Sequence, residues 1–224
     1  MAEKMDYKLA YKELYQPTRE PGFIDVPEIL FLMVDGHGDP NQEGGEYQKA
    51  VELLYALTFT IKMSSKGSKV LPGFFEYAVP PLEGLWWLDD DKDMDFFSRK
   101  ERYCWTSMIR QPEFVTEEVF AWAKEEVRRK KPDLDTDLAK LVPFAEGLCV
   151  QAMHLGPYDK EPETLAKMEA YIHQSGLDID IGTPLKNGMV KRHHEIYLGD
   201  PRKTKPENLK TVLRHPVKRR VGLV

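Results

Sequence analysis

The chain has 224 residues, a formal net charge of −5, 42% hydrophobic residues and 31% charged residues. This composition is typical of a globular protein, and the mean hydropathy of −0.51, with no long apolar run, excludes a transmembrane helix. The acidic balance differs from the basic faces of nucleic-acid-binding proteins, so neither nucleic acid nor membrane is expected as a partner. The charged start lacks the apolar segment of a secretory signal, which favours a cytoplasmic protein.

In the first half of the chain, the hydrophobic pattern predicts a strand, a helix and then further strands. Residues 29–34 form a continuous apolar run, which predicts a buried strand followed by a turn. Apolar residues at helical spacing predict an amphipathic helix over 46–62. Further along, strands are predicted at 74–79, 82–88 and 102–109, with an acidic loop at 89–95.

The second half shows a similar succession of patterns. Strands are predicted at 147–155 and 190–198, with a helix over 162–174 between them. Residues 204–213 begin with a T-x-x-E capping pattern, which predicts a last helix. The basic residues 218–220 are interpreted as a solvated tail.

The two halves share the order strand, turn, helix and strands, so we predict an α+β fold of two β-α-β-β repeats. The repeats cover 23–110 and 144–217 within a single domain, and a helical insertion at 112–143 separates them. In that insertion, Thr116 is a good N-cap for a helix that ends in the basic run 128–131. Pairing the repeats predicts an antiparallel, concave sheet with helices on one face and the other face free to bind a ligand.

Each repeat places a glutamate among aromatic residues in a late strand. Glu83 precedes Trp86 and Trp87, and Glu195 precedes Tyr197. A carboxylate among apolar rings is costly to bury unless it is paired or hydrogen-bonded. The pattern therefore indicates a site, unless both glutamates simply face water. Adjacent strand residues face opposite sides, so only one of Trp86 and Trp87 can point into a groove.

Several longer motifs are specific enough to indicate a family. They are DGHGDP, EYQKA, PPLEGLWW, MIRQP and HHEIYLGDP, in this order along the chain. With these motifs the chain resembles the GyrI-like small-molecule-binding proteins in their stand-alone form, over about residues 5–217. The resemblance implies duplicated β-α-β-β modules with a ligand groove at the pseudo-twofold axis, in agreement with the repeat.

The resemblance also implies a class of ligands and two candidate functions. Relatives fused to helix-turn-helix segments are multidrug-sensing transcription regulators, which hold flat cationic drugs with a buried glutamate and aromatic rings. That glutamate corresponds to Glu195 here. Some stand-alone relatives hydrolyse cyclopropane-bearing DNA-alkylating natural products, which is a detoxification. The alternative is a non-catalytic drug-binding or gyrase-modulating protein.

A planar or cationic ligand would be sandwiched by aromatic side chains and attracted by a glutamate. Tyr103 and Trp105 share one face of their strand, so both belong to the pocket or both to the core. The residues expected to bind the ligand are Trp86, Trp87, Trp105, Tyr197 and His154, with core packing as the alternative for the tryptophans.

Hydrolysis of a strained ring would need an acid and a base. Two carboxylates in an apolar groove suit these roles, because burial raises one pKa while the other group stays ionised. Glu195 is the first choice for the base and Glu83 for its partner. Tyr103 or Tyr197 could donate a hydrogen bond to the ligand carbonyl.

No metal and no cofactor are expected. His193 and His194 point to opposite faces of a strand, which disfavours a shared metal site, so His194 or His154 is more readily a hydrogen-bond partner of a glutamate. The sequence GHG lacks the third glycine of a dinucleotide-binding motif. Cys104 and Cys149 are interpreted as free thiols. The expected partner is thus a small molecule, and the pattern does not specify an oligomeric state.

Overall fold

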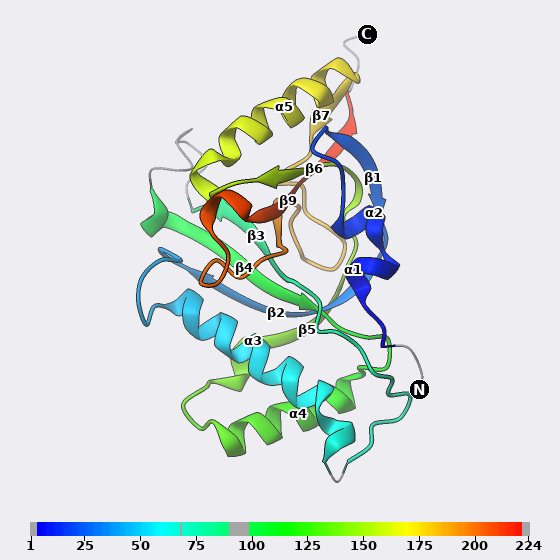
Figure 1. The fold of residues 1–224 in the computed structure, drawn as a ribbon, viewed down its shortest axis with the longest axis vertical. Coiled ribbons are helices and arrows are strands. Elements are labelled where there is room, and N and C mark those ends of the chain that lie inside the picture. Colours follow the sequence, from blue (N-terminus) through cyan, green and yellow to red (C-terminus); the bar gives the residue numbers. More distant parts are fainter. Residues whose placement is uncertain (1–3, 68, 90–98, 221–224) are drawn as a thin grey trace. The chain divides into compact units, whose positions relative to one another are not determined.

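A computed structural model describes residues 4–67, 69–89 and 99–220 as an α+β protein with antiparallel strand pairs (Figure 1). The predicted fold class is confirmed, and the acidic loop expected at 89–95 falls largely outside the described residues. The chain forms two compact units, of which unit 1 comprises Met1–Ala10, Ile29–Leu82 and Trp87–Pro143. Unit 2 comprises Tyr11–Glu28, Glu83–Trp86 and Phe144–Val224.

Within the described residues, unit 1 has a sheet with the strand order β4-β2-β5, and its long helices α3 and α4 lie side by side (Figure 1). The long helix α3 packs an apolar stripe, including Leu54, Leu57 and Ile61, against β2, whose central residues are themselves buried. The strands β2 and β4 pair antiparallel from Phe31↔Arg110 to His37↔Cys104. The elements are α1 (Tyr7–Ala10), β2 (Ile29–His37), α3 (Glu46–Lys62), η1 (Ser64–Lys66), η3 (Lys100–Arg102), β4 (Tyr103–Arg110), α4 (Glu117–Lys130), η4 (Thr136–Leu138) and β5 (Ala139–Phe144).

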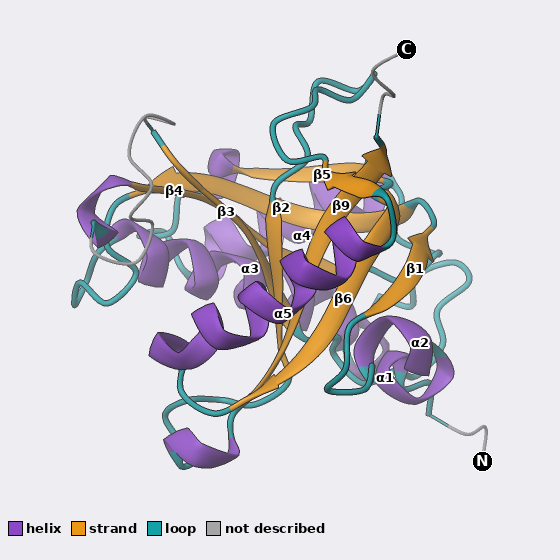
Figure 2. Cartoon of the chain, turned by 90° about the horizontal axis from the view of Figure 1, so that it is seen from above, coloured by secondary structure: helices purple, strands orange, loops and turns teal. Residues whose placement is uncertain are grey.

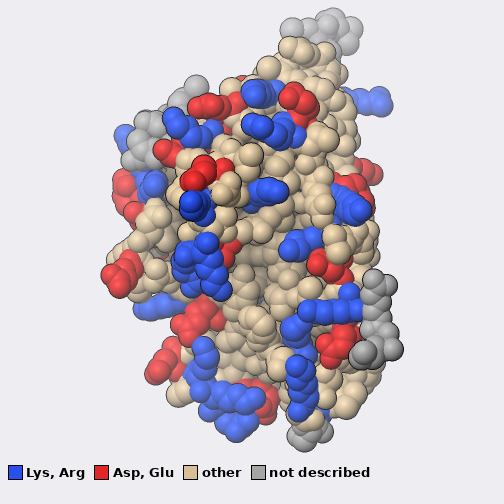
Figure 3. All heavy atoms as spheres, in the orientation of Figure 1, with Lys and Arg blue, Asp and Glu red and all other residues tan. Residues whose placement is uncertain are grey.

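The insertion contains the predicted helix α4 and also a strand that the pattern does not predict. Thr116 caps α4 by accepting a hydrogen bond from the Val119 backbone N–H. The cations that end the helix form ion pairs. Arg128 pairs with Glu125 and Asp137, and the next three cations, residues 129–131, pair with Glu126 or Glu52. On the face of the molecule drawn in Figure 3, Lys and Arg likewise alternate with Asp and Glu. The basic run is therefore a helix end, as predicted, and the following strand β5 extends the unit 1 sheet beside β2.

Unit 2 has a sheet in the order β1-β6-β9-β8-β3, with β7 paired to β9. The helix α5 crosses one face of β6 and β9 (Figure 2), and Met168 and Ile172 pack there on Val150, Ala152 and Leu213. The elements are α2 (Lys12–Tyr15), β1 (Gly22–Val26), residues 83–86 of β3 (Leu82–Leu88), β6 (Gly147–Leu155), η5 (Tyr158–Lys160), α5 (Glu161–Gln174), β7 (Leu177–Ile179), β8 (His193–Tyr197), η6 (Pro206–Asn208) and β9 (Lys210–Arg219).

The predicted duplication is visible in the order of elements. The succession β2-α3-β3-β4 recurs as β6-α5-β8-β9, and in both repeats the first strand pairs antiparallel with the last.

The last helix predicted at 204–213 is wrong. Residues 206–208 form only a short 3-10 turn, and the chain then enters β9. That strand is buried from Thr211 to Val217 and pairs with β6 on one side and β8 on the other. Two ladders of backbone hydrogen bonds and the burial of seven consecutive residues outweigh a local capping pattern. The basic residues expected as a tail belong to this strand or follow it, and Lys218 and Arg220 pair with Asp180 and Asp178.

The strand predicted at 74–79 is also wrong. It reduces to one parallel bridge between Tyr77 and Met5.

Candidate functional site

The strand β8 sends alternate side chains to the two faces of the unit 2 sheet. His193, Glu195 and Tyr197 share one face, and His194 points to the other. Glu195 lies directly opposite Leu213 of β9, and Leu213 packs in the core beneath α5. The Glu195 side chain therefore lies on the face of the sheet that α5 covers.

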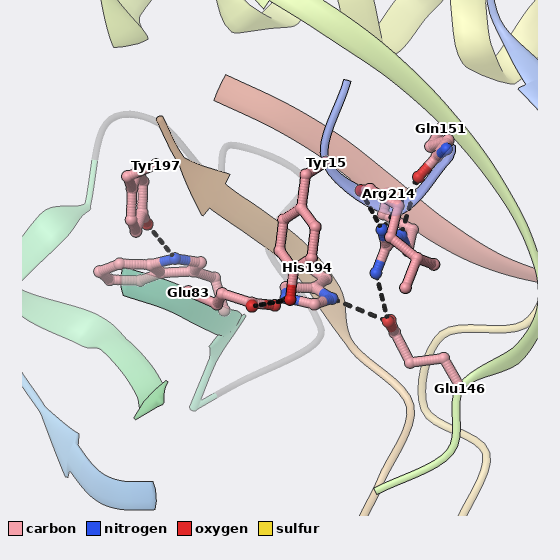
Figure 4. Close-up of polar contacts among 9 residues, drawn as sticks. Tyr15, Glu83, Glu146, Gln151, His194, Tyr197 and Arg214 are labelled. Atoms are coloured by element: carbon pink, nitrogen blue, oxygen red, sulfur yellow. Dashed lines mark hydrogen bonds and ion pairs between the residues drawn. The ribbon is translucent and has the colours of Figure 1, made fainter. Parts of the chain in front are cut away.

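Both carboxylate oxygens of Glu195 contact side chains of its own strand. Tyr197 donates its hydroxyl to Oε2 over 2.7 Å, and His193 Nε2 lies 2.9 Å from Oε1. The Tyr197 hydroxyl in turn accepts a hydrogen bond of 2.8 Å from Nε1 of Trp86 on β3 (Figure 4). With 8% exposure, the carboxylate is partly desolvated, which strengthens its attraction for positive charge.

His193 connects Glu195 to a second histidine. Its Nδ1 lies 2.8 Å from Nε2 of His215 on β9, and the two rings meet edge-on at 4.9 Å. Burial, followed by the neighbouring His193, lowers the pKa of His215 to about 3. His215 is therefore a neutral imidazole at physiological pH.

A second carboxyl group, from Glu161, belongs to this site. Glu161 is the first residue of α5 and is 2% exposed. Burial, and then the adjacent Glu195 carboxylate, raises the pKa of Glu161 well above its ordinary value. The raised pKa favours the protonated form of Glu161 beside the Glu195 carboxylate, an arrangement that can supply an acid and a base. An acid in the first turn of a helix is ordinary, and no local feature separates Glu161 from the exposed Glu163.

Two aromatic rings contact Tyr197, the tyrosine that donates to the Glu195 carboxylate. Trp86 and Tyr197 are joined by their hydrogen bond, and Tyr158 meets the Tyr197 ring edge-on at 6.0 Å. Gly84 makes room for this arrangement, because a Cβ there would lie 2.6 Å from Nε1 of Trp86. Of the two adjacent tryptophans, Trp86 is therefore the one on the face of Glu195.

The opposite face of the unit 2 sheet carries a buried network of charged groups. His194 contacts Glu83 through Nε2 at 3.0 Å and Glu146 through Nδ1 at 2.9 Å. Arg214 Nη1 donates to the same Glu146 oxygen over 3.0 Å, and Tyr15 donates its hydroxyl to Glu83 over 3.3 Å (Figure 4). The four charged side chains are at most 3% exposed. We call these residues (Glu83, Glu146, His194 and Arg214) the buried quartet.

The quartet balances its charges. Burial alone would lower the pKa of His194, but the carboxylates of Glu146 and Glu83 reverse that effect and raise it to about 9. Burial likewise opposes ionisation of Glu146, but His194 and Arg214 lower its pKa to about 2. An imidazolium can donate to both carboxylates, whereas a neutral imidazole has only one N–H. The quartet therefore contains two anions and two cations at neutral pH.

The two glutamates expected to act together lie on opposite faces of the sheet. Glu83 contacts His194, and Glu195 contacts His193, which is the preceding residue and points the other way. The structure does not bring Glu83 and Glu195 into one site. The carboxyl group beside Glu195 is that of Glu161.

Three of the predicted aromatic residues belong to unit 1. Trp105 has no exposed surface, meets Tyr47 edge-on at 5.2 Å, and leaves no room for a Cβ at Gly36. Trp105 is therefore a core residue of unit 1. Tyr103 is buried at the start of β4, and Trp87 is half-buried near the end of β3.

His154 lies in unit 2 but contacts groups other than glutamate. Its Nδ1 lies 2.9 Å from the Thr164 hydroxyl and its Nε2 3.1 Å from the Pro157 carbonyl oxygen. The side chain thus connects the end of β6 to the start of α5. Cys149 is a buried free thiol, as predicted.

Within the described ranges, the structure has no group of three His, Cys, Asp or Glu side chains suited to a metal ion. Among the same residues, no helix combines the length and apolarity needed to span a bilayer.

A family model of the GyrI-like small-molecule-binding domain matches residues 19–218 of the chain. The crystal structure of an uncharacterized conserved protein from Listeria innocua is 51% identical, covers 96% of this chain and 100% of that chain, and has a TM-score of 0.87. The structure of a hydrolase from Listeria innocua is 50% identical, with the same coverage and a TM-score of 0.84.

A more distant structure, the EcmrR–DNA complex, is 10% identical, covers 95% of this chain and 63% of that chain, and has a TM-score of 0.50. At this identity the likeness concerns the fold alone. A search of curated proteins found no match.

Proposed function

The chain belongs to the family of GyrI-like small-molecule-binding domains, and we propose that unit 2 binds a planar small molecule beside Glu195 and adds water to a strained ring in it. The substrates would be electrophiles in which a cyclopropane is conjugated to a carbonyl group, and their hydrolysis would detoxify them. Planar cations would bind at the same residues without being hydrolysed.

The observation that carries this proposal is the hydrogen-bonded chain from Trp86 through Tyr197 to Glu195, with the Glu161 carboxyl beside it. Tyr197 donates to the carboxylate and therefore fixes the direction in which Oε2 points. In the proposed complex the rings of Trp86 and Tyr197 would stack on a flat ligand, and each good cation–π contact is worth about 0.5–2 kcal/mol.

The proposed reaction uses the two carboxyl groups in different protonation states. Glu195 takes a proton from a water molecule while the water oxygen forms a bond to the ring carbon. The strained carbon–carbon bond breaks, and its electron pair moves through the conjugated ring to the carbonyl oxygen, which takes the proton of Glu161. The net change is the addition of one water molecule. Proton transfer from Glu195 to Glu161 restores the starting state. General acid–base assistance of this kind is worth about 10²–10⁴-fold for each group.

The similarity to a hydrolase from Listeria innocua over 96% of this chain supports the catalytic version of the proposal. A protein that only sequesters drugs would need the aromatic rings and the carboxylate, but it would not need a second carboxyl group with a raised pKa.

The test uses a neutral spirocyclopropyl cyclohexadienone, whose conversion to a hydroxyethyl phenol is followed by ultraviolet absorbance. Glu195→Gln keeps the shape of the side chain but removes the base. We expect its kcat to fall by about 10²–10⁴-fold, while KM stays near the wild-type value because the substrate is uncharged. Glu163→Gln, on the exposed surface of the same helix as Glu161, is the matched control and should behave as wild type.

The outcomes separate the two functions. Binding of the dienone without turnover by the wild-type protein would refute hydrolysis and leave a drug-binding protein. Unchanged turnover in Glu195→Gln would show that the chemistry takes place elsewhere.

A further inference from the structure

Two histidines in a row beside Glu195, His193 and His215, have no part in the proposed reaction. His193 lies between Glu195 and His215, with one ring nitrogen 2.9 Å from the carboxylate and the other 2.8 Å from the second imidazole. All three side chains are buried or nearly so. Each link has the length of a good hydrogen bond, so the proton positions along this row are strongly constrained.

We propose that His193 and His215 are positioning residues for Glu195. His193 donates its Nε2–H to Glu195 Oε1, and His215 donates its Nε2–H to His193 Nδ1. His215 thereby fixes the tautomer of His193, and His193 fixes the rotation of the carboxylate so that Oε2 faces Tyr197 and the ligand. This inference rests on the proposed function of Glu195 and names further residues of the same site.

The alternatives for the proton positions are less favourable. His215 is neutral because burial lowers its pKa to about 3, so it carries one N–H. If that hydrogen were on Nδ1, a buried donor would have no partner, since His215 Nδ1 meets none among the described residues. Buried N–H groups without partners are rarer than unsatisfied acceptors. A His193 with its hydrogen on Nδ1 would turn a bare Nε2 toward a carboxylate oxygen, and the two lone pairs would repel each other.

The first experiment reads the proton positions directly, without a ligand. Imidazole ¹⁵N NMR spectra of the full chain distinguish the two neutral tautomers and the imidazolium. We expect the spectra to show both neutral rings, His193 and His215, as Nε2–H tautomers. A His193 signal typical of the Nδ1–H tautomer would overturn the proposal, whatever the protein does to a ligand.

The second experiment measures the dissociation constant of ethidium, a planar cation. His193→Gln keeps an N–H donor, whereas His193→Phe keeps a ring without a donor. Loss of a hydrogen bond to a charged group corresponds to about 10–100-fold in affinity, so we expect that weakening in His193→Phe. His193→Gln should bind ethidium near the wild-type level.

His215→Phe tests whether His215 acts through His193. Loss of one neutral hydrogen bond corresponds to about fivefold in affinity, and we expect that effect in the wild-type background but not in His193→Gln. An equal effect in both backgrounds, or equal weakening by His193→Gln and His193→Phe, would overturn the positioning roles.

If the wild-type protein neither binds ethidium nor opens the dienone, the proposed function fails, and the NMR spectra still decide whether the histidines hold Glu195.

Discussion

The buried quartet allows a quantitative prediction for Glu146→Gln. The substitution changes the shape of the side chain little and leaves an amide oxygen that can still accept hydrogen bonds from His194 and Arg214. It removes one negative charge from a group of two anions and two cations that are at most 3% exposed. The remaining two cations then face only Glu83.

The size of the effect follows from the pKa of His194. Its increase from 6.5 to about 9 corresponds to about 2–3 kcal/mol of folding free energy at neutral pH, at about 1.4 kcal/mol per unit. The lowered pKa of Glu146 describes the same interaction from the other partner and is not added. Breaking buried ion pairs by removing one partner typically costs about 3–5 kcal/mol. We therefore expect Glu146→Gln to lower the free energy of unfolding by about 3 kcal/mol.

The pH dependence has a definite sign. His194 has a raised pKa in the folded state, so its contribution is complete below 6.5 and is lost as the pH rises through about 9. Glu146 has a lowered pKa, so its contribution is present above 4.5 and is lost as the pH falls through about 2. The difference in stability between wild type and Glu146→Gln should be largest between these windows and should shrink in alkaline solution.

Hydrogen exchange of peptides from β8 and β9, followed by mass spectrometry, measures this stability in unit 2 specifically. Glu163→Gln removes an exposed carboxylate from the same unit and serves as the control. A loss below about 1 kcal/mol, the range of exposed ion pairs, would refute the reasoning, as would a difference that stays constant from neutral to alkaline pH.

Three further substitutions test local packing and capping. Gly84→Ala puts a Cβ 2.6 Å from Nε1 of Trp86. We expect weaker ethidium binding, measured by fluorescence titration, and a decrease of about 1–3 kcal/mol in the free energy of unfolding. Unchanged affinity would contradict the assigned role of Trp86. Gly36→Ala puts a Cβ 2.2 Å from the fully buried Trp105 ring, and the urea midpoint of unit 1 should fall by about 1 M; an unchanged midpoint would show that the ring can move. Thr116→Ala removes the cap of α4 and should cost about 1 kcal/mol in a urea titration, whereas Thr116→Ser should cost much less.

The sequence predicts local features of the site better than the pairing between distant strands. Alternation along β8 correctly separates His193 from His194. Hydrophobic periodicity likewise predicts α3 over 46–62, the bounds that the structure has.

The role of Glu83 cannot be predicted from a short stretch of sequence around it. Its face is set by the pairing of β3 with β8, which are far apart in the chain. The Glu161 carboxyl reaches Glu195 only because α5 packs across the sheet, so its raised pKa is a tertiary effect. The error at 204–213 has the same origin, since pairing with β6 and β8 decides the fate of that segment.

The hydrogen bonds of Arg214 have a consequence for folding during synthesis. Its Nη2 donates to the Leu14 carbonyl oxygen across a sequence separation of 200 residues, and Gln151 donates to the Glu13 carbonyl oxygen. A strand made late by the ribosome thus completes contacts with a segment made early. Unit 2 cannot reach its native state until β9 has left the exit tunnel, whereas every strand of unit 1 has emerged well before. The nascent chain should therefore depend on chaperones mainly for the early segment, which waits longest for its partners.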